Sequence, residues 1–297
     1  MKKLGLATAL LLAMTGAQAY QFEVQGQSEF IDNTANEQDF TGAVQGTYYF
    51  NNVDASKGPL AEAAFLNQAS NVSAAYTYGE DGQEFGDRTV HHTFGVKGEA
   101  YIPTQVVPAY ASASYSHTIA DNKAGKADDN GDRYALELGA LLIPNFLVAV
   151  GYTSVADQTS YDAFNMFNNG VIKAGLESQT INGDQDAITA RTKYVGAIDG
   201  TNMSIGFESG LVYGEDTAYN LGTTLFLNPQ LSVGASYMES SFAGSPDKAW
   251  GANVNYFITP AVAVGASYVN ANYEANLAQT AQVRDTQTIG VNAKFRF

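Results

Sequence analysis

Apolar and polar residues alternate with a period of two in many separate stretches of the chain. Between residues 40 and 50, for example, Phe40, Val44 and Phe50 alternate with Gln45 and Thr47. Successive side chains of a strand point to opposite faces, so this period predicts strands with one apolar and one polar face. About fourteen stretches show it, near residues 20–30, 40–50, 71–79, 91–102, 108–118, 133–143, 146–153, 187–198, 203–213, 218–227, 231–238, 249–258, 261–269 and 286–297. The pattern predicts an all-β protein.

The alternation alone leaves open which face of each strand points inward. A soluble sandwich buries its apolar face, whereas a transmembrane barrel turns that face to lipid and keeps the polar face in the lumen. Stretches of about nine to eleven residues match a tilted crossing of the hydrocarbon core. Short turns, as at 143–145 and 228–229, alternate with longer acidic loops at 121–132, 154–186 and 270–285. We therefore predict a transmembrane antiparallel up-and-down β-barrel of about 14 strands, with 154–186 as the longest extracellular loop.

Residues 1–19 have the features of a secretory signal peptide. Lys2 and Lys3 precede an apolar run, and Ala17-Gln18-Ala19 forms a small-x-small cleavage site. The chain is thus predicted to divide into a signal peptide, 1–19, and an outer-membrane barrel domain, 20–297. Loss of the two lysines takes the formal charge from -15 to -17. So acidic a chain argues against nucleic acid as a partner, because binding to phosphates relies on Lys and Arg.

Aromatic residues gather near both ends of the predicted strands. Tyr20, Phe50 and Phe297 lie at the short-turn ends, and Phe30 and Trp250 lie at the long-loop ends. Two belts of this kind are expected where amphipathic rings sit at the two membrane interfaces. The chain has no cysteine, and a closed barrel needs none, since its strands satisfy one another's backbone groups.

Two segments carry a resemblance to a known family. The run AYQFEVQGQSEFIDNTANEQDFTGAVQGTYYF (19–50) and the run GPLAEAAFLNQASNV (58–72) closely resemble the thirty-three-to-thirty-six-kilodalton outer-membrane porin family of Acinetobacter. The likeness extends along the whole chain. It implies a barrel channel for water, ions and small nutrients, of a family linked to carbapenem susceptibility, and it implies no cofactor and no catalytic residue.

The carboxyl-terminal strand resembles the terminal strands of other bacterial barrels. Phe295 and Phe297 match the aromatic pair at its end, whereas Asn292 stands where glycine is usual, with Gly290 nearby. The partners implied are outer-membrane lipid and lipopolysaccharide, small polar solutes or ions, and the barrel-assembly machinery, which would bind the strand that ends at Phe297.

The polar face of the predicted strands carries charges of both signs, which we take as candidate pore-lining residues. They are Glu23, Lys97, Glu99, Glu137, Arg191, Lys193, Glu208, Lys294 and Arg296. Opposed charges in a wet lumen set a transverse field that sorts ions by sign. Adjacent strands can also simply pair them, Arg191 and Lys193 with Glu208, and Lys294 and Arg296 with Glu23. Pairing is favoured, and the two interpretations are compatible.

Residues 59–70 interrupt the alternation in a connection that the barrel places on the periplasmic side. Proline at a first-turn position and the apolar residues after it predict a short helix. The segment is either a plug or gate that enters the lumen, with Leu60, Glu62, Phe65 and Leu66 as its candidate residues, or a loop at the rim.

Catalytic and metal sites find little support in the sequence. Ser116 and His117 are adjacent on a predicted strand, so their side chains point to opposite faces. The acidic run 128–132 resembles the start of a calcium loop but lacks its glycine and its final glutamate. No enzymatic activity, cofactor or metal is therefore predicted. Two functions remain: a passive channel for water, ions and small polar solutes, gated or narrowed by an in-folded segment, and a non-conducting barrel with a structural or adhesive surface role.

Overall fold

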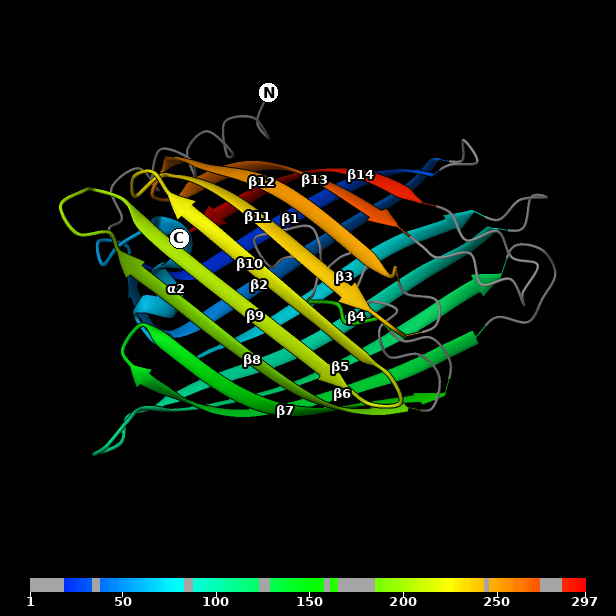
Figure 1. The fold of residues 1–297 in the computed structure, drawn as a ribbon, viewed down its shortest axis with the longest axis horizontal. Coiled ribbons are helices and arrows are strands. Elements are labelled where there is room, and N and C mark those ends of the chain that lie inside the picture. Colours follow the sequence, from blue (N-terminus) through cyan, green and yellow to red (C-terminus); the bar gives the residue numbers. More distant parts are fainter. Residues whose placement is uncertain are drawn as a thin grey trace, which may run out of the picture.

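A computed structural model describes residues 19–33, 38–82, 88–122, 129–157, 161–164, 185–242, 246–272 and 285–297. Almost all of the predicted signal peptide, and much of the three long loops, lie outside these residues. The described chain forms fourteen strands that close into one antiparallel barrel (Figure 1). The strand number and the up-and-down topology predicted from the alternation are confirmed.

The strands follow one another around the barrel in chain order. They are β1 (Ala19–Asn33), β2 (Gln38–Asp54), β3 (Asn71–Gly82), β4 (Arg88–Ile102), β5 (Ala109–Asn122), β6 (Asp129–Ile143), β7 (Phe146–Asp157), β8 (Gln185–Ala197), β9 (Ser204–Tyr213), β10 (Thr217–Phe226), β11 (Leu231–Ser240), β12 (Lys248–Thr259), β13 (Val262–Asn272) and β14 (Thr286–Arg296). Two short helical turns, η1 (Leu60–Glu62) and α2 (Ala63–Leu66), lie between β2 and β3. No helix in the described part of the chain is long and apolar enough to cross a membrane.

The first and last strands close the barrel. β14 pairs antiparallel with β1, and the register sets Arg296 opposite Glu23 and Lys294 opposite Gln25. Backbone bonds continue the seam to the end of the chain, because the amide of Phe22 donates to the carbonyl of Phe297. The two strands therefore form the seam that closure of an up-and-down barrel requires.

The outer face of the barrel is apolar and exposed. Leu138, at 67%, and Ile289, at 59%, are among the large hydrophobic side chains that face outward, as are Val24 and Val44. An apolar surface that extends around the whole barrel would be unfavourable in water. It is the surface that contact with the hydrocarbon core of a membrane requires. The predicted apolar-out arrangement is observed.

Tyr20 is an exception to the predicted belt at the short-turn end. An irregularity in the β1–β2 register between Tyr20 and Phe22 breaks the strict alternation. A bulge inserts one residue, so the side chains before it change faces. Tyr20 consequently points inward and is buried, while Phe22 remains exposed on the outside.

Connections of different length separate the two ends of the barrel, which we call the short-turn rim and the long-loop rim. The β6–β7, β10–β11 and β12–β13 turns lie at the short-turn rim, together with η1, α2 and the carboxyl terminus (Figure 1). The predicted bounds of the loop 154–186 include residues that belong to strands. Ser154 and Asp186 are opposite each other in the β7–β8 ladder, so the loop is shorter than predicted. Strand pairing thus continues beyond the membrane-sized segments.

Candidate channel and its charged lining

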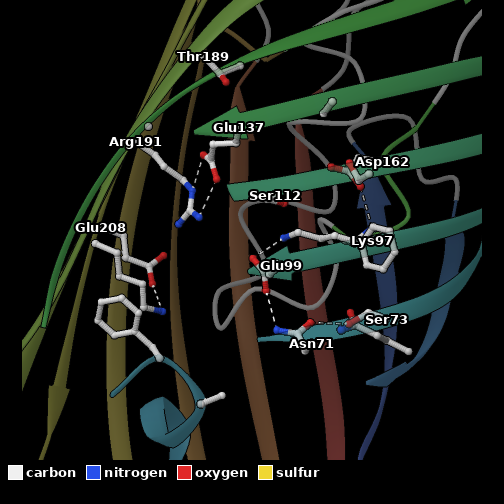
Figure 2. A pocket seen from close by; sticks show the side chains of 18 of the residues that line it. Asn71, Ser73, Lys97, Glu99, Ser112, Glu137, Asp162, Thr189, Arg191 and Glu208 are labelled. Carbon is white, nitrogen blue, oxygen red and sulfur yellow. Dashed lines mark hydrogen bonds and ion pairs between the residues drawn. The ribbon is translucent and has the colours of Figure 1, made fainter. Parts of the chain in front are cut away.

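The nine predicted lumen charges line one cavity of about 400 Å³ inside the barrel. They come from six strands, β1, β4, β6, β8, β9 and β14, and the period of two turns each of them to the same side of the wall. Small and hydroxylated residues, among them Ser73, Ser112 and Thr189, stand between the charges in the cavity lining (Figure 2).

Arg191 pairs with Glu137. The pairing with Glu208 that was predicted from adjacent strands is wrong for this residue. Its Nε lies 2.7 Å from Glu137 Oε1, and its Nη2 lies 2.9 Å from Glu137 Oε2. The two residues are on β8 and β6, so the guanidinium reaches across β7. On β7 the inward positions between them are Ala149 and Gly151, opposite Arg191 and Glu137 respectively. The lack of bulk at these positions permits the bidentate pair, which Figure 2 shows from the side.

Lys193 has two carboxylate partners. Its Nζ lies 2.8 Å from Glu208 Oε1, the predicted neighbour on β9, and 2.8 Å from Glu62 Oε2 of η1. The same ammonium lies 5.2 Å from the centre of the Phe65 ring. Lys193 therefore connects the barrel wall to the segment between β2 and β3.

Two cations share Glu23 at the barrel seam, as the register implies. Lys294 Nζ lies 3.0 Å from Glu23 Oε1, and Arg296 Nε lies 2.7 Å from Glu23 Oε2. Arg296 is 2% exposed, and its guanidinium carbon lies over the rings of Tyr20 and Phe257, 4.5 and 4.7 Å from their centres. The inward position of Tyr20 allows this contact with Arg296.

A chain of polar contacts joins the remaining two charges, Lys97 and Glu99, to the Arg191–Glu137 pair and involves residues of five strands, β3, β4, β5, β6 and β8. Lys97 Nζ lies 3.1 Å from Glu99 Oε1, and Asn71 donates to Glu99 Oε2 at 3.2 Å. The Tyr110 hydroxyl donates to Glu99 at 2.7 Å and accepts from Arg191 Nη2 at 2.9 Å. The Lys97–Glu99 and Arg191–Glu137 pairs are therefore one network around part of the wall.

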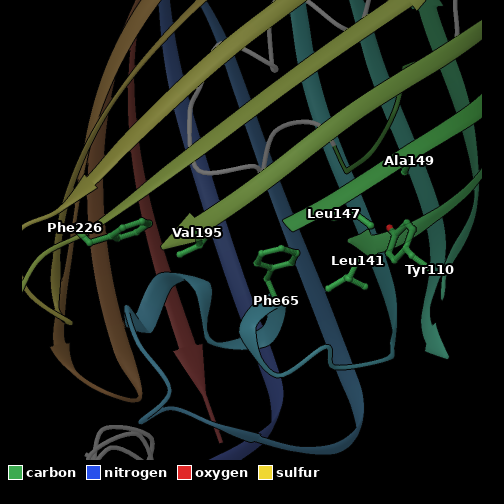
Figure 3. Packing of buried hydrophobic residues seen from close by; sticks show 7 residues of the cluster. All are labelled: Phe65, Tyr110, Leu141, Leu147, Ala149, Val195 and Phe226. Atoms are coloured by element: carbon green, nitrogen blue, oxygen red, sulfur yellow. The ribbon is translucent and has the colours of Figure 1, made fainter. Parts of the chain in front are cut away.

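Residues 59–70 pack against the inner wall of the barrel at the short-turn rim. Phe65 packs in a cluster with inward side chains of five strands; the other buried members are Tyr110, Leu141, Leu147, Ala149, Val195 and Phe226. Figure 3 shows Phe65 reaching from α2 toward these strands. Leu60 packs instead against Phe257 of β12, and Ala63 packs against Tyr20 and Tyr49 of β1 and β2. The segment thus touches the wall on several sides.

Polar contacts also hold this segment in place. Arg296 Nη1 donates to the Leu60 carbonyl at 2.8 Å, and the Leu60 amide donates to the Pro229 carbonyl at 2.8 Å. Gln68 donates from Nε2 to the carbonyl of Pro144 at 3.3 Å. Leu60, Glu62 and Phe65 are buried, whereas Leu66 is only partly buried. Leu60, Glu62 and Phe65 therefore contact the inner face of the barrel wall.

Comparison with known proteins agrees with this architecture. A family model described as "Putative general bacterial porin" matches residues 1–295. The chain belongs to this porin family. The crystal structure of the Acinetobacter baumannii outer membrane protein Omp33 is 55% identical to the porin, with a TM-score of 0.69, over 94% of this chain and 99% of that one. A search of curated proteins gives no match.

More distant structures share the fold of this porin. A Pseudomonas aeruginosa FadL homologue has a TM-score of 0.56 at 9% identity, covering 96% of this chain and 92% of that one. The monoaromatic hydrocarbon channel CymD has a TM-score of 0.55 at 11% identity, covering 95% and 90%. At such identities the likeness concerns the barrel alone. Family and fold together make the porin an outer-membrane β-barrel with a channel role.

The porin also carries an in-folded segment that the sequence did not reveal. Tyr161–Phe164, from the connection between β7 and β8, lie against the inner wall. The amide of Tyr161 donates to Thr118 Oγ1 at 3.0 Å, and the amide of Ala163 donates to Ser116 Oγ at 3.2 Å. Both acceptors are on β5. A Cβ on Gly95 of β4 would meet Ala163 Cβ at 2.7 Å, so this glycine permits the close approach.

Arg133 is a further cavity-lining residue missing from the predicted set, and the alternation could have identified it. It precedes Tyr134, an outward residue of β6, and so faces inward, where it lines the cavity. The acidic run before it directed attention to a calcium loop. Asp129–Asp132 of that run instead belong to β6, and no group of three or more potential ligands among the described residues is arranged to hold a metal ion.

Proposed function

We propose that the porin is a passive channel for water, ions and small polar solutes, narrowed where residues 59–70 cross the lumen. The observation that carries the proposal is a charged, hydroxyl-lined cavity inside a closed wall whose outer face is apolar. A barrel that served only as a surface scaffold would not need charged residues throughout its interior, because buried charges are costly. Such residues are favourable in a lumen that holds water.

The arrangement of the charges supports selection by size and polarity over strong selection by sign. Five of the cations in the lining, Lys97, Arg191, Lys193, Lys294 and Arg296, lie within 3.1 Å of a carboxylate oxygen. Paired charges largely cancel at a distance, yet each pair offers donors and acceptors to a solute that loses part of its hydration. A solute of low polarity makes few hydrogen bonds to this lining, so its transfer from water into the pore is unfavourable in free energy.

Residues 59–70 are the proposed constriction. Their contacts involve inward side chains on several sides of the barrel, and a segment that touches several sides reduces the open cross-section between them. By the usual arrangement of bacterial barrels, the short-turn rim faces the periplasm. The proposed constriction is therefore at the periplasmic end of the pore.

Single-channel recording tests the proposal. Ala61–Ala69 would be replaced by a short Gly-Ser linker in the purified protein, and conductance would be measured in planar bilayers. We expect several-fold higher conductance from a barrel that remains heat-modifiable on gels. The matched control replaces Gln105 and Val106, which are exposed in the β4–β5 turn at the same rim, and should conduct like the unaltered protein.

Two results would contradict the proposal in different ways. Equal conductance of the unaltered and the linker protein would mean that the segment does not limit the pore. Absence of current from both would favour the alternative, a non-conducting barrel with a structural or adhesive surface role.

Export and assembly complete the proposed function. We propose that cleavage after Ala19 removes the signal peptide, which mass determination of the protein from outer membranes would test.

The barrel-assembly machinery would recognise β14 through the terminal Phe297, so a chain lacking Phe297 should accumulate less in the outer membrane than the full chain. Lipopolysaccharide would contact the outer face at the long-loop rim.

A further inference from the structure

Arg133 differs from the other cations that line the cavity. It lies on β6 opposite Ser116 of β5 and Val155 of β7, and it takes part in none of the ion pairs formed among the described residues. Its Nε and Nη1 have no hydrogen-bond partner and are covered by protein atoms in this conformation, so they reach a solute once the side chain turns toward the cavity that it lines. Two guanidinium nitrogens without acceptors in a cavity wall are unusual, because buried polar groups are normally satisfied.

The acceptors that share this part of the cavity are engaged with other donors. Glu137 accepts both of its short hydrogen bonds from Arg191. Ser116 Oγ accepts from the amide of Ala163, and Asp162 Oδ1 accepts from the amide of Phe164. None of these hydrogen bonds involves Arg133, whose Nε and Nη1 stay without an acceptor, although a guanidinium presents five donors in a planar fork.

We infer that Arg133 binds the carboxylate of a small hydroxylated organic acid inside the cavity. A carboxylate is planar and can accept two parallel hydrogen bonds from a guanidinium, which a spherical halide cannot. Ser112, Ser114, Thr153 and Thr189 line the same cavity, and their hydroxyls can bind hydroxyl groups of such a solute. A cavity of about 400 Å³ lies in the range of small-molecule sites.

The inference deepens the proposed channel function, because a solute in transit would meet this site, but binding can be measured without any current. The probe is gluconate, which carries one carboxylate and several hydroxyls, and its neutral counterpart is sorbitol. Each is titrated calorimetrically into folded protein in detergent. The variants are Arg133→Gln and, as control, Lys57→Gln, which removes the same charge from an exposed position in the β2–β3 connection.

We expect gluconate to bind the unaltered protein and Lys57→Gln with the same dissociation constant, within about twofold. Loss of a charge-assisted hydrogen-bond pair should weaken binding to Arg133→Gln by about tenfold or more. Sorbitol should bind far more weakly than gluconate, and tenfold excess chloride should not displace gluconate. Heat-modifiable migration of each variant checks that the barrel is folded.

The inference would be overturned by equal binding of gluconate to Arg133→Gln and the unaltered protein, by equal binding of sorbitol, or by full displacement with chloride. Absence of gluconate binding to the unaltered protein would overturn it as well. The proposed function fails separately, through absence of current in bilayers, and a protein that binds gluconate but does not conduct would refute only the channel.

Discussion

Replacement of Phe65 by alanine should release residues 59–70 from the barrel wall without unfolding the barrel. The Phe65 ring is 7% exposed and packs against inward side chains of β5, β6, β7, β8 and β10. Truncation of a buried phenylalanine in a close-packed core costs about 3–5 kcal/mol. Water in the lumen can fill part of the space left here, so we expect the lower end, about 3 kcal/mol.

A loss of this size has a measurable consequence for the position of the segment. Each 1.4 kcal/mol changes an equilibrium constant by about tenfold, so the population with the segment undocked should rise by roughly 100-fold. The strands themselves keep their hydrogen-bonded ladders. The variant should therefore remain a folded barrel with a more open short-turn rim.

Thiol labelling measures the undocked population directly. The chain has no native cysteine, and Ala63, which follows η1, is 1% exposed. In an Ala63→Cys background, Phe65→Ala should raise the labelling rate with a hydrophilic maleimide by about 100-fold. Phe50→Ala is the matched control, because Phe50 is 55% exposed on the outer face near the same rim. Equal labelling rates with and without Phe65→Ala, in barrels that remain heat-modifiable, would refute the role of the Phe65 contacts.

Two further predictions concern the barrel wall. Gln25→Cys should react with a water-soluble thiol reagent in outer membranes and Val24→Cys should not, because Gln25 lines the cavity and Val24 is on the outer face; the reverse pattern would mean that the faces are inverted. Glu23→Gln should lower the free energy of unfolding in urea by about 3–5 kcal/mol, since it leaves Arg296 buried without a full counter-charge. Glu208→Gln, at a side chain that is 39% exposed, should cost less than about 1 kcal/mol, and equal losses in the two variants would contradict this account.

Much of the barrel could be predicted because its signal is local. The choice of face at Val24, Gln25 or Val44 depends only on the period of two and on the membrane environment. The same period places all nine predicted charges in the cavity lining, and it places Arg133 there too, because Arg133 begins the predicted stretch 133–143 and precedes the outward Tyr134.

Pairing between neighbouring strands was also largely predictable. Glu23 meets Lys294 and Arg296 because the chain ends must adjoin when a barrel closes. Arg191 was assigned to an adjacent strand and the assignment was wrong. Its long side chain passes over the small residues of β7 to Glu137, which depends on side-chain volumes on a third strand.

The sequence by itself determined the strands, their two faces, the charged lining and the family of this porin, because each follows from local periodicity or from motifs contiguous in the chain. Only the tertiary structure decided which connecting segments lie against the inner wall. The sequence left residues 59–70 open between rim and lumen and gave no sign of Tyr161–Phe164, and both lie against inward side chains from several strands. Such contacts join residues far apart in the chain and exist only once the barrel has closed, so no local pattern encodes them.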